Sequence, residues 1–137
     1  MAQFRTLVYE RKVYDFDFDV EENNTSNPAT ITFRVYSIPR NPDRFFKYTF
    51  SILDNETVKS ETADHHDLEE FKQKGLPEKI LEIASEILNR DIKSSPITFQ
   101  RGNFLIPAAK KAWERLVLTN PNAEKDELND CFILRRK

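Results

Sequence analysis

The stretch Lys72-Gln73-Lys74-Gly75-Leu76-Pro77 marks the place where the hydrophobic pattern of the chain changes. Before this stretch, apolar residues alternate with polar ones, which is typical of strands with one buried face. After it, apolar residues recur at the spacing of an amphipathic helix, and the proline suits a first helical turn. The helical set consists of Leu76, Ile80, Ile83, Ala84, Ile87 and Leu88. This change of period predicts an α+β fold with a strand-rich first half and a helical second half.

The strand-rich half predicts an antiparallel meander. We expect strands within 6–20, over 30–36 and 46–52 and, with a more polar pattern, over 58–64, with polar turns at 21–28, 39–43 and 54–55. The alternation is clearest at the end of the first segment, where Tyr14, Phe16, Phe18 and Val20 would share the buried face. Asp15, Asp17 and Asp19 would face water there. Because an extended strand cannot wrap carboxylates around a cation, no metal site is expected on this row.

The second half continues as helix, strand, helix, strand. After the helix that begins at Gly75, a short strand is expected at 92–95 and a final strand at 131–134. Between them a helix is predicted from Pro107, because its apolar residues follow helical spacing. These residues are Ala109, Ala112, Trp113, Leu116 and Val117. Two main helices would therefore pack against the sheet.

Composition limits the classes of protein to which the chain can belong. Its 137 residues suit one domain, 1–137, with the meander in 1–64 and the second half in 72–135. A formal net charge of −2 does not favour a nucleic-acid binder, and no apolar run is long enough to cross a membrane. Without an apolar leader and with one cysteine, a cytoplasmic location is expected. Cys131, inside an apolar strand, is expected to be a buried thiol.

Two groups of residues are candidates for chemistry. His65 and His66 are the two histidines of the chain, and on a strand they would point in opposite directions, so they cannot easily share a metal ion. Lys72 to Pro77 is a basic segment with a glycine that leads into a helix. A helix N-terminus has unpaired N–H groups and a partial positive charge, which together can hold a phosphate. An ordinary loop before a helix is the alternative interpretation.

The second half resembles the GNAT superfamily of N-acetyltransferases. In that family an Arg/Gln-x-x-Gly-x-Gly/Ala loop opens the helix that holds the pyrophosphate of acetyl-coenzyme A, and Lys72, Gly75 and Pro77 would occupy its three signature positions. Residues 109–117, AKKAWERLV, resemble the family's late A-x-x-F-Y-E-K-L-G-F helix. The resemblance implies a mixed sheet, an acetyl-coenzyme A site and transfer of an acyl group to an amine. The cofactor-binding residues would be Lys72, Gln73, Lys74, Gly75, Leu76 and Pro77.

The chain departs from the family pattern at several positions. It lacks the two early helices, and Pro77 removes an N–H that a phosphate could have used. Trp113 stands where many members have a tyrosine that protonates the leaving thiolate, and an indole cannot perform that proton transfer. The strand before the loop often supplies a base in the family, and Glu61 or His65 would be the catalytic candidates here. The chain would thus be a divergent or degenerate member.

Three functional hypotheses follow. The chain is an acyl-coenzyme A-dependent N-acyltransferase, a non-catalytic protein of the same fold, or an unrelated α+β module for protein interaction or regulation. Tyr9, Tyr36 and Phe45 lie off the main apolar stripes and would be available to a protein partner or to a second copy in a homodimer.

Overall fold

A computed structural model describes residues 3–9, 12–25, 27–64, 71, 75–97 and 107–136, with side chains from Phe16 onward. The described residues form an α+β fold with eight strands and two helices. In chain order these are β1 (Gln3–Tyr9), β2 (Lys12–Asn23), β3 (Thr30–Ser37), β4 (Phe46–Ile52), β5 (Thr57–Asp64), α1 (Leu76–Leu88), β6 (Asp91–Lys93), α2 (Pro107–Thr119), β7 (Ala123–Asp126) and β8 (Cys131–Leu134).

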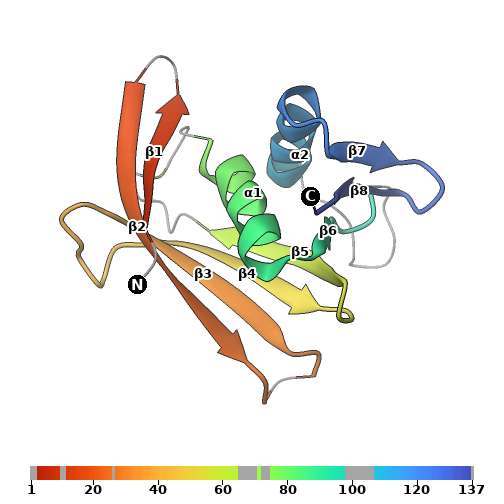
Figure 1. Cartoon of the computed structure of the whole chain (residues 1–137), viewed down its shortest axis with the longest axis horizontal. Coiled ribbons are helices and arrows are strands. Elements are labelled where there is room, and N and C mark those ends of the chain that lie inside the picture. Colours follow the sequence, from red (N-terminus) through yellow and green to blue (C-terminus); the bar gives the residue numbers. More distant parts are fainter. Residues whose placement is uncertain are drawn as a thin grey trace.

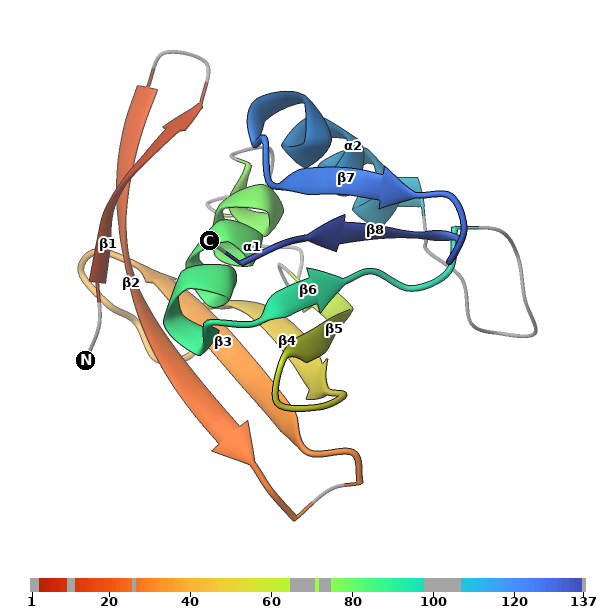
Figure 2. The same cartoon turned by 45° about the vertical axis from the view of Figure 1, so that its right-hand side comes forward.

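All eight strands belong to one mixed sheet with the order β1-β2-β3-β4-β5-β6-β8-β7. The first five strands form an antiparallel meander in which each strand pairs with the next. β5 and β6 are parallel, and α1 provides the crossover that a parallel pair requires. β8 and β7 complete the sheet in antiparallel pairing. Figure 1 shows α1 beside the meander and α2 beside β7, and Figure 2 shows β6, β8 and β7 side by side.

One hydrophobic core joins the two halves of the chain. The meander contributes an aromatic stripe to it, and the helices and β8 contribute apolar residues from the other side. Its members include Phe16, Phe18, Phe33, Val35, Phe46, Phe50, Val58, Leu76, Ile80, Leu81, Ile92, Trp113, Leu116, Phe132 and Leu134. The predicted alternation of β3 and β4 is confirmed, because the core receives every second residue of both strands.

Several expectations about element limits are wrong. The segment 6–20 contains two strands instead of one, and β2 continues to Asn23 into the region expected to be a polar turn. Val20 is 41% exposed because this end of β2 extends past the helices, and Ile87 of α1 is 47% exposed. β7 was missed, because its sequence Ala-Glu-Lys-Asp has little strand character and it acquires strand structure by pairing with β8.

Two carboxylates of the acidic row of β2, those of Asp17 and Asp19, lie close to Arg40 and do not simply face water. Arg40 donates a hydrogen bond from Nη1 to Asp19 Oδ2 at 2.8 Å, and its Nε is 3.9 Å from Asp17 Oδ2. The same guanidinium lies 4.0 Å from the ring centroid of Tyr36, which also packs against Phe45. Tyr36 is therefore covered by its own chain. This differs from the expectation that its ring would be available to a partner. The side chain of Tyr9 lies outside the described residues.

Cys131 is buried, as its apolar neighbours predict. Phe132 and Leu134 face the helical core, so alternation places Cys131 and Ile133 on the other face of β8. Burial, and to a smaller extent the charge of Asp126, raises the pKa of the thiol. A protonated, enclosed thiol is a poor nucleophile, which favours a structural role. In the part of the chain that the structure describes, neither helix has the length and apolar composition needed to cross a bilayer.

Candidate functional site

The predicted helix start is present at Gly75. α1 begins directly after this residue, whose φ of 70° and ψ of 20° lie in the left-handed region that favours glycine. Pro77 lies in the first turn, and the Lys79 N–H donates to the Gly75 carbonyl at 3.1 Å. The helix has no side-chain hydrogen bond at its N-cap, so the first-turn N–H groups of Leu76 and Glu78 are not capped in this way. An anion would find two donors there, because Pro77 has none.

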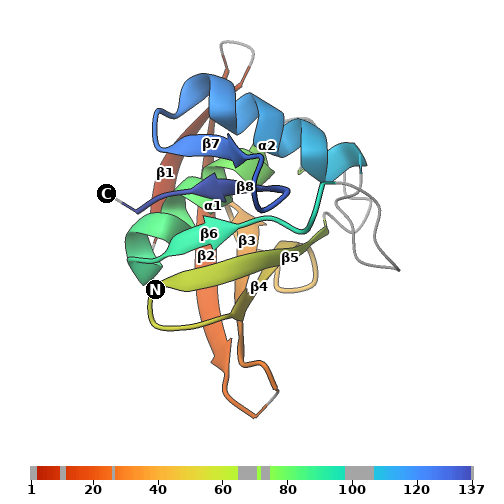
Figure 3. The ribbon, with the colours of Figure 1, turned by 90° about the vertical axis from the view of Figure 1, so that its right-hand side faces the viewer.

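β5 and β6 part close to this helix start. Their parallel ladder joins Thr57 to Asp91, Val58 to Ile92 and Lys59 to Lys93, and it then ends. The chain after β6 follows β8, since the Ser94 N–H donates to Phe132 O at 2.9 Å. β5 continues to Asp64 beside β4, and among the described residues no strand pairs with its other edge beyond Lys59. We call this divergence after Lys59 and Lys93 the strand fork, and Figure 3 shows β5 and β6 leading into it.

A polar cluster lies beneath α1 at the strand fork. Tyr48 of β4 is buried, and the pKa of its hydroxyl is raised, first by burial and also by the nearby charge of Glu78, despite a hydrogen bond with Ser60. Ser60 in turn donates from Oγ to Lys93 O at 3.4 Å, across the point where the strands part. Glu78 is held by Arg115 of α2, whose Nη2 and Nε lie 2.6 and 2.9 Å from Glu78 Oε1. These contacts place the first turn of α1 over the strand fork.

The last residues of β5 are exposed. Glu61 is an extra residue in the pairing with β4, because Phe50 pairs with Ser60 and Thr49 with Thr62. Beyond this bulge, Ala63 pairs with the core-facing Tyr48 and so belongs to the helix side of the sheet, yet it is exposed. The helix side of β5 is thus exposed to solvent at Ala63.

Of the two catalytic candidates, Glu61 is in the described part of the chain. Its Oε1 accepts a hydrogen bond from Ser51 Oγ at 2.9 Å and lies 3.6 Å from Lys59 Nζ. Ser51 alternates with the core-facing Phe50, so Glu61 lies on the face of the sheet away from the helices. Glu61 and Gly75 therefore flank the strand fork from opposite faces. His65, Lys72, Gln73 and Lys74 lie outside the described residues, whereas Gly75, Leu76 and Pro77 have the predicted positions at the start of α1.

Trp113 belongs to the core. It is 1% exposed, and its indole stacks on Phe132 with ring centroids 5.9 Å apart and planes inclined by 10°. Its Nε1 is buried without a hydrogen-bond partner in the described structure. Trp113 thus packs α2 onto β8 and supplies no proton-transfer group.

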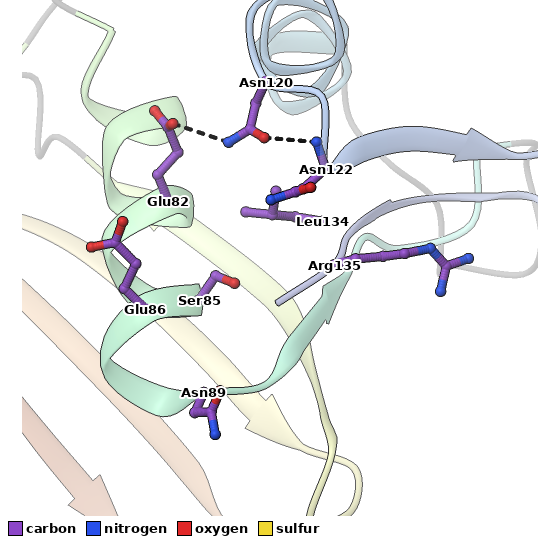
Figure 4. Close-up of a pocket in the computed structure, with 8 residues that line it drawn as sticks. All are labelled: Glu82, Ser85, Glu86, Asn89, Asn120, Asn122, Leu134 and Arg135. Atoms are coloured by element: carbon purple, nitrogen blue, oxygen red, sulfur yellow. Dashed lines mark hydrogen bonds between the residues drawn. The ribbon is translucent and has the colours of Figure 1, made fainter. Parts of the chain in front are cut away.

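A separate pocket of about 210 Å³ lies at the other end of α1. Its walls come from the last turns of α1, from the turn between α2 and β7, and from the end of β8 (Figure 4). Asn120 lies between the walls of the pocket. Its Nδ2 donates a hydrogen bond to Glu82 Oε2 at 3.0 Å, and its Oδ1 accepts one from the Asn122 N–H at 2.9 Å. Ser85 and Leu134 also line the pocket. Among the described residues, no three His, Cys, Asp or Glu side chains are grouped to hold a metal ion.

Sequence reasoning missed the polar cluster and the pocket. Ser60 gave a weak signal, because it is a polar residue at a core-facing position two residues after Val58. The contacts of Glu78 with Arg115 and of Glu82 with Asn120 gave none, since these partners are far apart in the sequence and meet only when α1 packs beside α2.

Comparison of the chain with known protein families, with curated proteins and with solved structures finds no match.

Proposed function

We propose that this chain binds an acyl-coenzyme A at the strand fork and transfers its acyl group to an amine, as a divergent GNAT-like domain. The observation that carries the proposal is the parallel β5-α1-β6 unit, whose strands part after three residue pairs beside a left-handed glycine that opens α1. Among the described residues, no strand pairs with this edge of β5 from Ser60 to Ala63, and the N–H groups at the start of α1 lie near the fork. Those two features suit an extended amide-containing chain and a phosphate group, respectively.

The arrangement of the second half also supports the proposal. A helix connects two adjacent parallel strands, a second helix follows, and a closing hairpin adds its last strand next to β6. This agrees with the element order that the resemblance over 72–135 implies. The fit to a phosphate is reduced by Pro77, which leaves the first turn with one donor fewer. Glu78 adds a negative charge there, although Arg115 neutralises it.

In the proposed reaction, the cofactor and the amine would approach the strand fork from opposite faces of the sheet. A bound thioester supplies the activated acyl group, and the amine must lose a proton before it attacks. Glu61 is placed on the face away from α1, so it suits deprotonation of an amine that approaches from that side while the cofactor phosphates lie at Gly75. Lys59 Nζ lies 3.6 Å from Glu61 Oε1 on the same face of the sheet.

A second candidate function is cofactor binding without acyl transfer. Trp113 favours it, because the residue at the position of the expected proton donor is buried in the core and stacked on Phe132. Such a protein would use the fork to sense or hold an acyl-coenzyme A. The two candidates share the binding step and differ in turnover.

Calorimetric titration with acetyl-coenzyme A tests the shared step. We expect micromolar binding that Lys72→Glu abolishes, whereas the same charge change at the exposed Lys110 of α2 leaves it intact. Pro77→Ala restores an N–H donor and should tighten binding at least tenfold, since a hydrogen bond to a charged group contributes about 1.5–3 kcal/mol. Absence of binding at millimolar cofactor would contradict the proposal.

Release of free coenzyme A thiol in the presence of primary amines then separates the two candidates. Turnover that falls in Glu61→Gln, with acetyl-coenzyme A affinity unchanged, supports the transferase. Binding without any amine-dependent thiol release supports the second candidate.

A further inference from the structure

Two lysines lie directly opposite each other at the strand fork, on the face of the sheet away from the helices. Lys59 of β5 and Lys93 of β6 form the last pair of the parallel ladder. Val58 and Ile92, the residues before them, are fully buried in the core, so alternation places both lysines on the outer face. Like charges that face each other across neighbouring strands destabilise a sheet. An anion bound beside this pair would relieve the repulsion.

The two lysines differ in their ion pairs. Lys59 Nζ is 3.6 Å from Glu61 Oε1, so it has a counter-charge on its own strand. In the described part of the chain no carboxylate forms an ion pair with Lys93. The side chain of Lys93 is half-buried, and its strand partners are Lys59 on one side and Ile133 of β8 on the other. Lys93 is thus a partly enclosed cation at the edge of the fork, next to a second cation.

The proposed base lies close to this cation. Glu61 follows Lys59 by two residues on the outer face, and the hydrogen bond from Ser51 Oγ at 2.9 Å orients its carboxylate. With strands about 4.8 Å apart and a rise of about 3.3 Å per residue, the Cα atoms of Glu61 and Lys93 are roughly 8 Å apart. A compact molecule could therefore meet the Glu61 carboxylate with a cationic group and the Lys93 ammonium with an anionic group.

These charges bear on the amine that the strand fork would acylate. A polyamine would bring further positive charge next to Lys59 and Lys93. An acceptor with an anionic group beside its amine would instead pair with Lys93 while its ammonium group meets Glu61. We propose that the acceptor is a small primary amine with a carboxylate or phosphate group close to the amine. This inference rests on the acyl transfer proposed above.

The transfer to such an acceptor balances without a further reactant. Glu61 accepts one proton from the ammonium group, and the nitrogen then forms a bond to the acyl carbon while the carbon–sulfur bond of the thioester breaks. Coenzyme A leaves as the thiolate, which a second proton from the nitrogen neutralises, and Glu61 returns its proton to water. Lys93 takes no part in these steps and holds the anionic group of the acceptor.

Coenzyme A thiol release with ethanolamine, L-serine and phosphoethanolamine tests the proposal, because the three amines share a two-carbon skeleton and differ in their anionic group. We expect kcat/KM to be about tenfold or more higher for serine or phosphoethanolamine than for ethanolamine, since one charged contact is added. The order of serine and phosphoethanolamine distinguishes a carboxylate from a phosphate. In Lys93→Gln the preference should disappear through a higher KM for the anionic amine, with the ethanolamine rate and acetyl-coenzyme A affinity unchanged.

Lys125→Gln is the matched control. Lys125 is an exposed lysine of β7 that pairs with the core-facing Phe132, so it lies on the helix side of the sheet. This variant should retain the preference for the anionic amine. Thermal unfolding should show Lys93→Gln to be at least as stable as the unaltered chain, because it removes the repulsion from Lys59. A lost preference would then not be a lost fold.

Heteronuclear NMR with phosphoethanolamine alone gives a readout that does not depend on turnover. We expect saturable shifts of the backbone amides of Lys59, Glu61 and Lys93 that are absent in Lys93→Gln. Equal kcat/KM for all three amines, a preference that persists in Lys93→Gln, or no saturable shift at millimolar phosphoethanolamine would overturn this acceptor class while leaving acyl transfer intact. Absence of acetyl-coenzyme A binding and of thiol release with every amine would instead contradict the transfer itself, and the acceptor class with it.

Discussion

Tyr48 introduces a hydroxyl into the core at the point where β5 and β6 part. Its ring stacks on Phe50 with centroids 4.7 Å apart, and its hydroxyl is bonded to Ser60 and close to the charge of Glu78. A phenolate in this place would lose its hydration and face a carboxylate, so the folded chain strongly favours the neutral phenol. Deprotonation of Tyr48 at alkaline pH should therefore destabilise the folded chain.

We expect the free energy of unfolding to fall as the pH rises above about 10, the ordinary pKa of tyrosine. The pKa of Tyr48 is raised in the folded state, so above that pH the unfolded chain releases a proton that the folded chain retains. One such proton corresponds to about 1.4 kcal/mol per pH unit. Tyr48→Phe should remove this part of the slope and change stability near neutral pH by about 1 kcal/mol or less. Urea unfolding of both proteins between pH 8 and pH 11 is the measurement, and parallel pH curves would contradict the expectation.

The two ends of α1 share an unusual backbone conformation. Gly75 before the helix and Asn89 after it both have positive φ, at 70° and 51°. At Gly75 this turns the chain into the helix beside the fork, and at Asn89 it turns the chain into β6. Glycine and asparagine adopt left-handed backbone conformations most easily, so the residue type at each end of α1 suits the conformation found there.

Substitution at each end should have opposite effects on stability. Gly75→Ala adds a Cβ in the left-handed region and should cost about 1–2 kcal/mol. Gly75→Asn should cost less despite its larger side chain, because asparagine tolerates this conformation. Asn89→Gly should be neutral or stabilise the fold slightly. Chemical unfolding followed by the fluorescence of the buried Trp113 gives all three values, and a greater loss in Gly75→Asn than in Gly75→Ala would refute the argument.

The elements that were predicted correctly have strong periodic patterns. Residues 76–88 and the helix from Pro107 were found because their apolar residues repeat at helical spacing, and the expected apolar stripes of β3 and β4 are in the core. β7 was not found, since four mostly charged residues show no strand period and become a strand only through β8. The boundary between β1 and β2 was missed because the sequence between Tyr9 and Lys12 contains no glycine, proline, asparagine, aspartate or serine that would indicate a turn.

At the scale of the whole molecule, the described strands form a single mixed sheet whose two parts are joined through β5 and β6. The sequence predicted both parts and the change between them, because each part has its own hydrophobic period. It did not predict the fork, which depends on where β6 ends and on Ser94 turning toward Phe132. It could not predict the pocket beside α1 either, because that pocket exists only where α1, the α2–β7 turn and β8 meet.

The shortness of the β5–β6 ladder has a consequence for native-state hydrogen exchange. β2 and β3 pair over eight residues, whereas the parallel ladder has three pairs and β6 joins β8 through two. Exchange through subglobal opening should therefore be governed by a lower free energy at Ile92 and Lys93 than at Phe33 and Val35. The meander would act as one cooperative unit, and β6, α2, β7 and β8 as another. If an acyl-coenzyme A spans the fork, its binding should slow exchange at Lys93 more than at Val35, so protection factors would report occupancy without any assay of turnover.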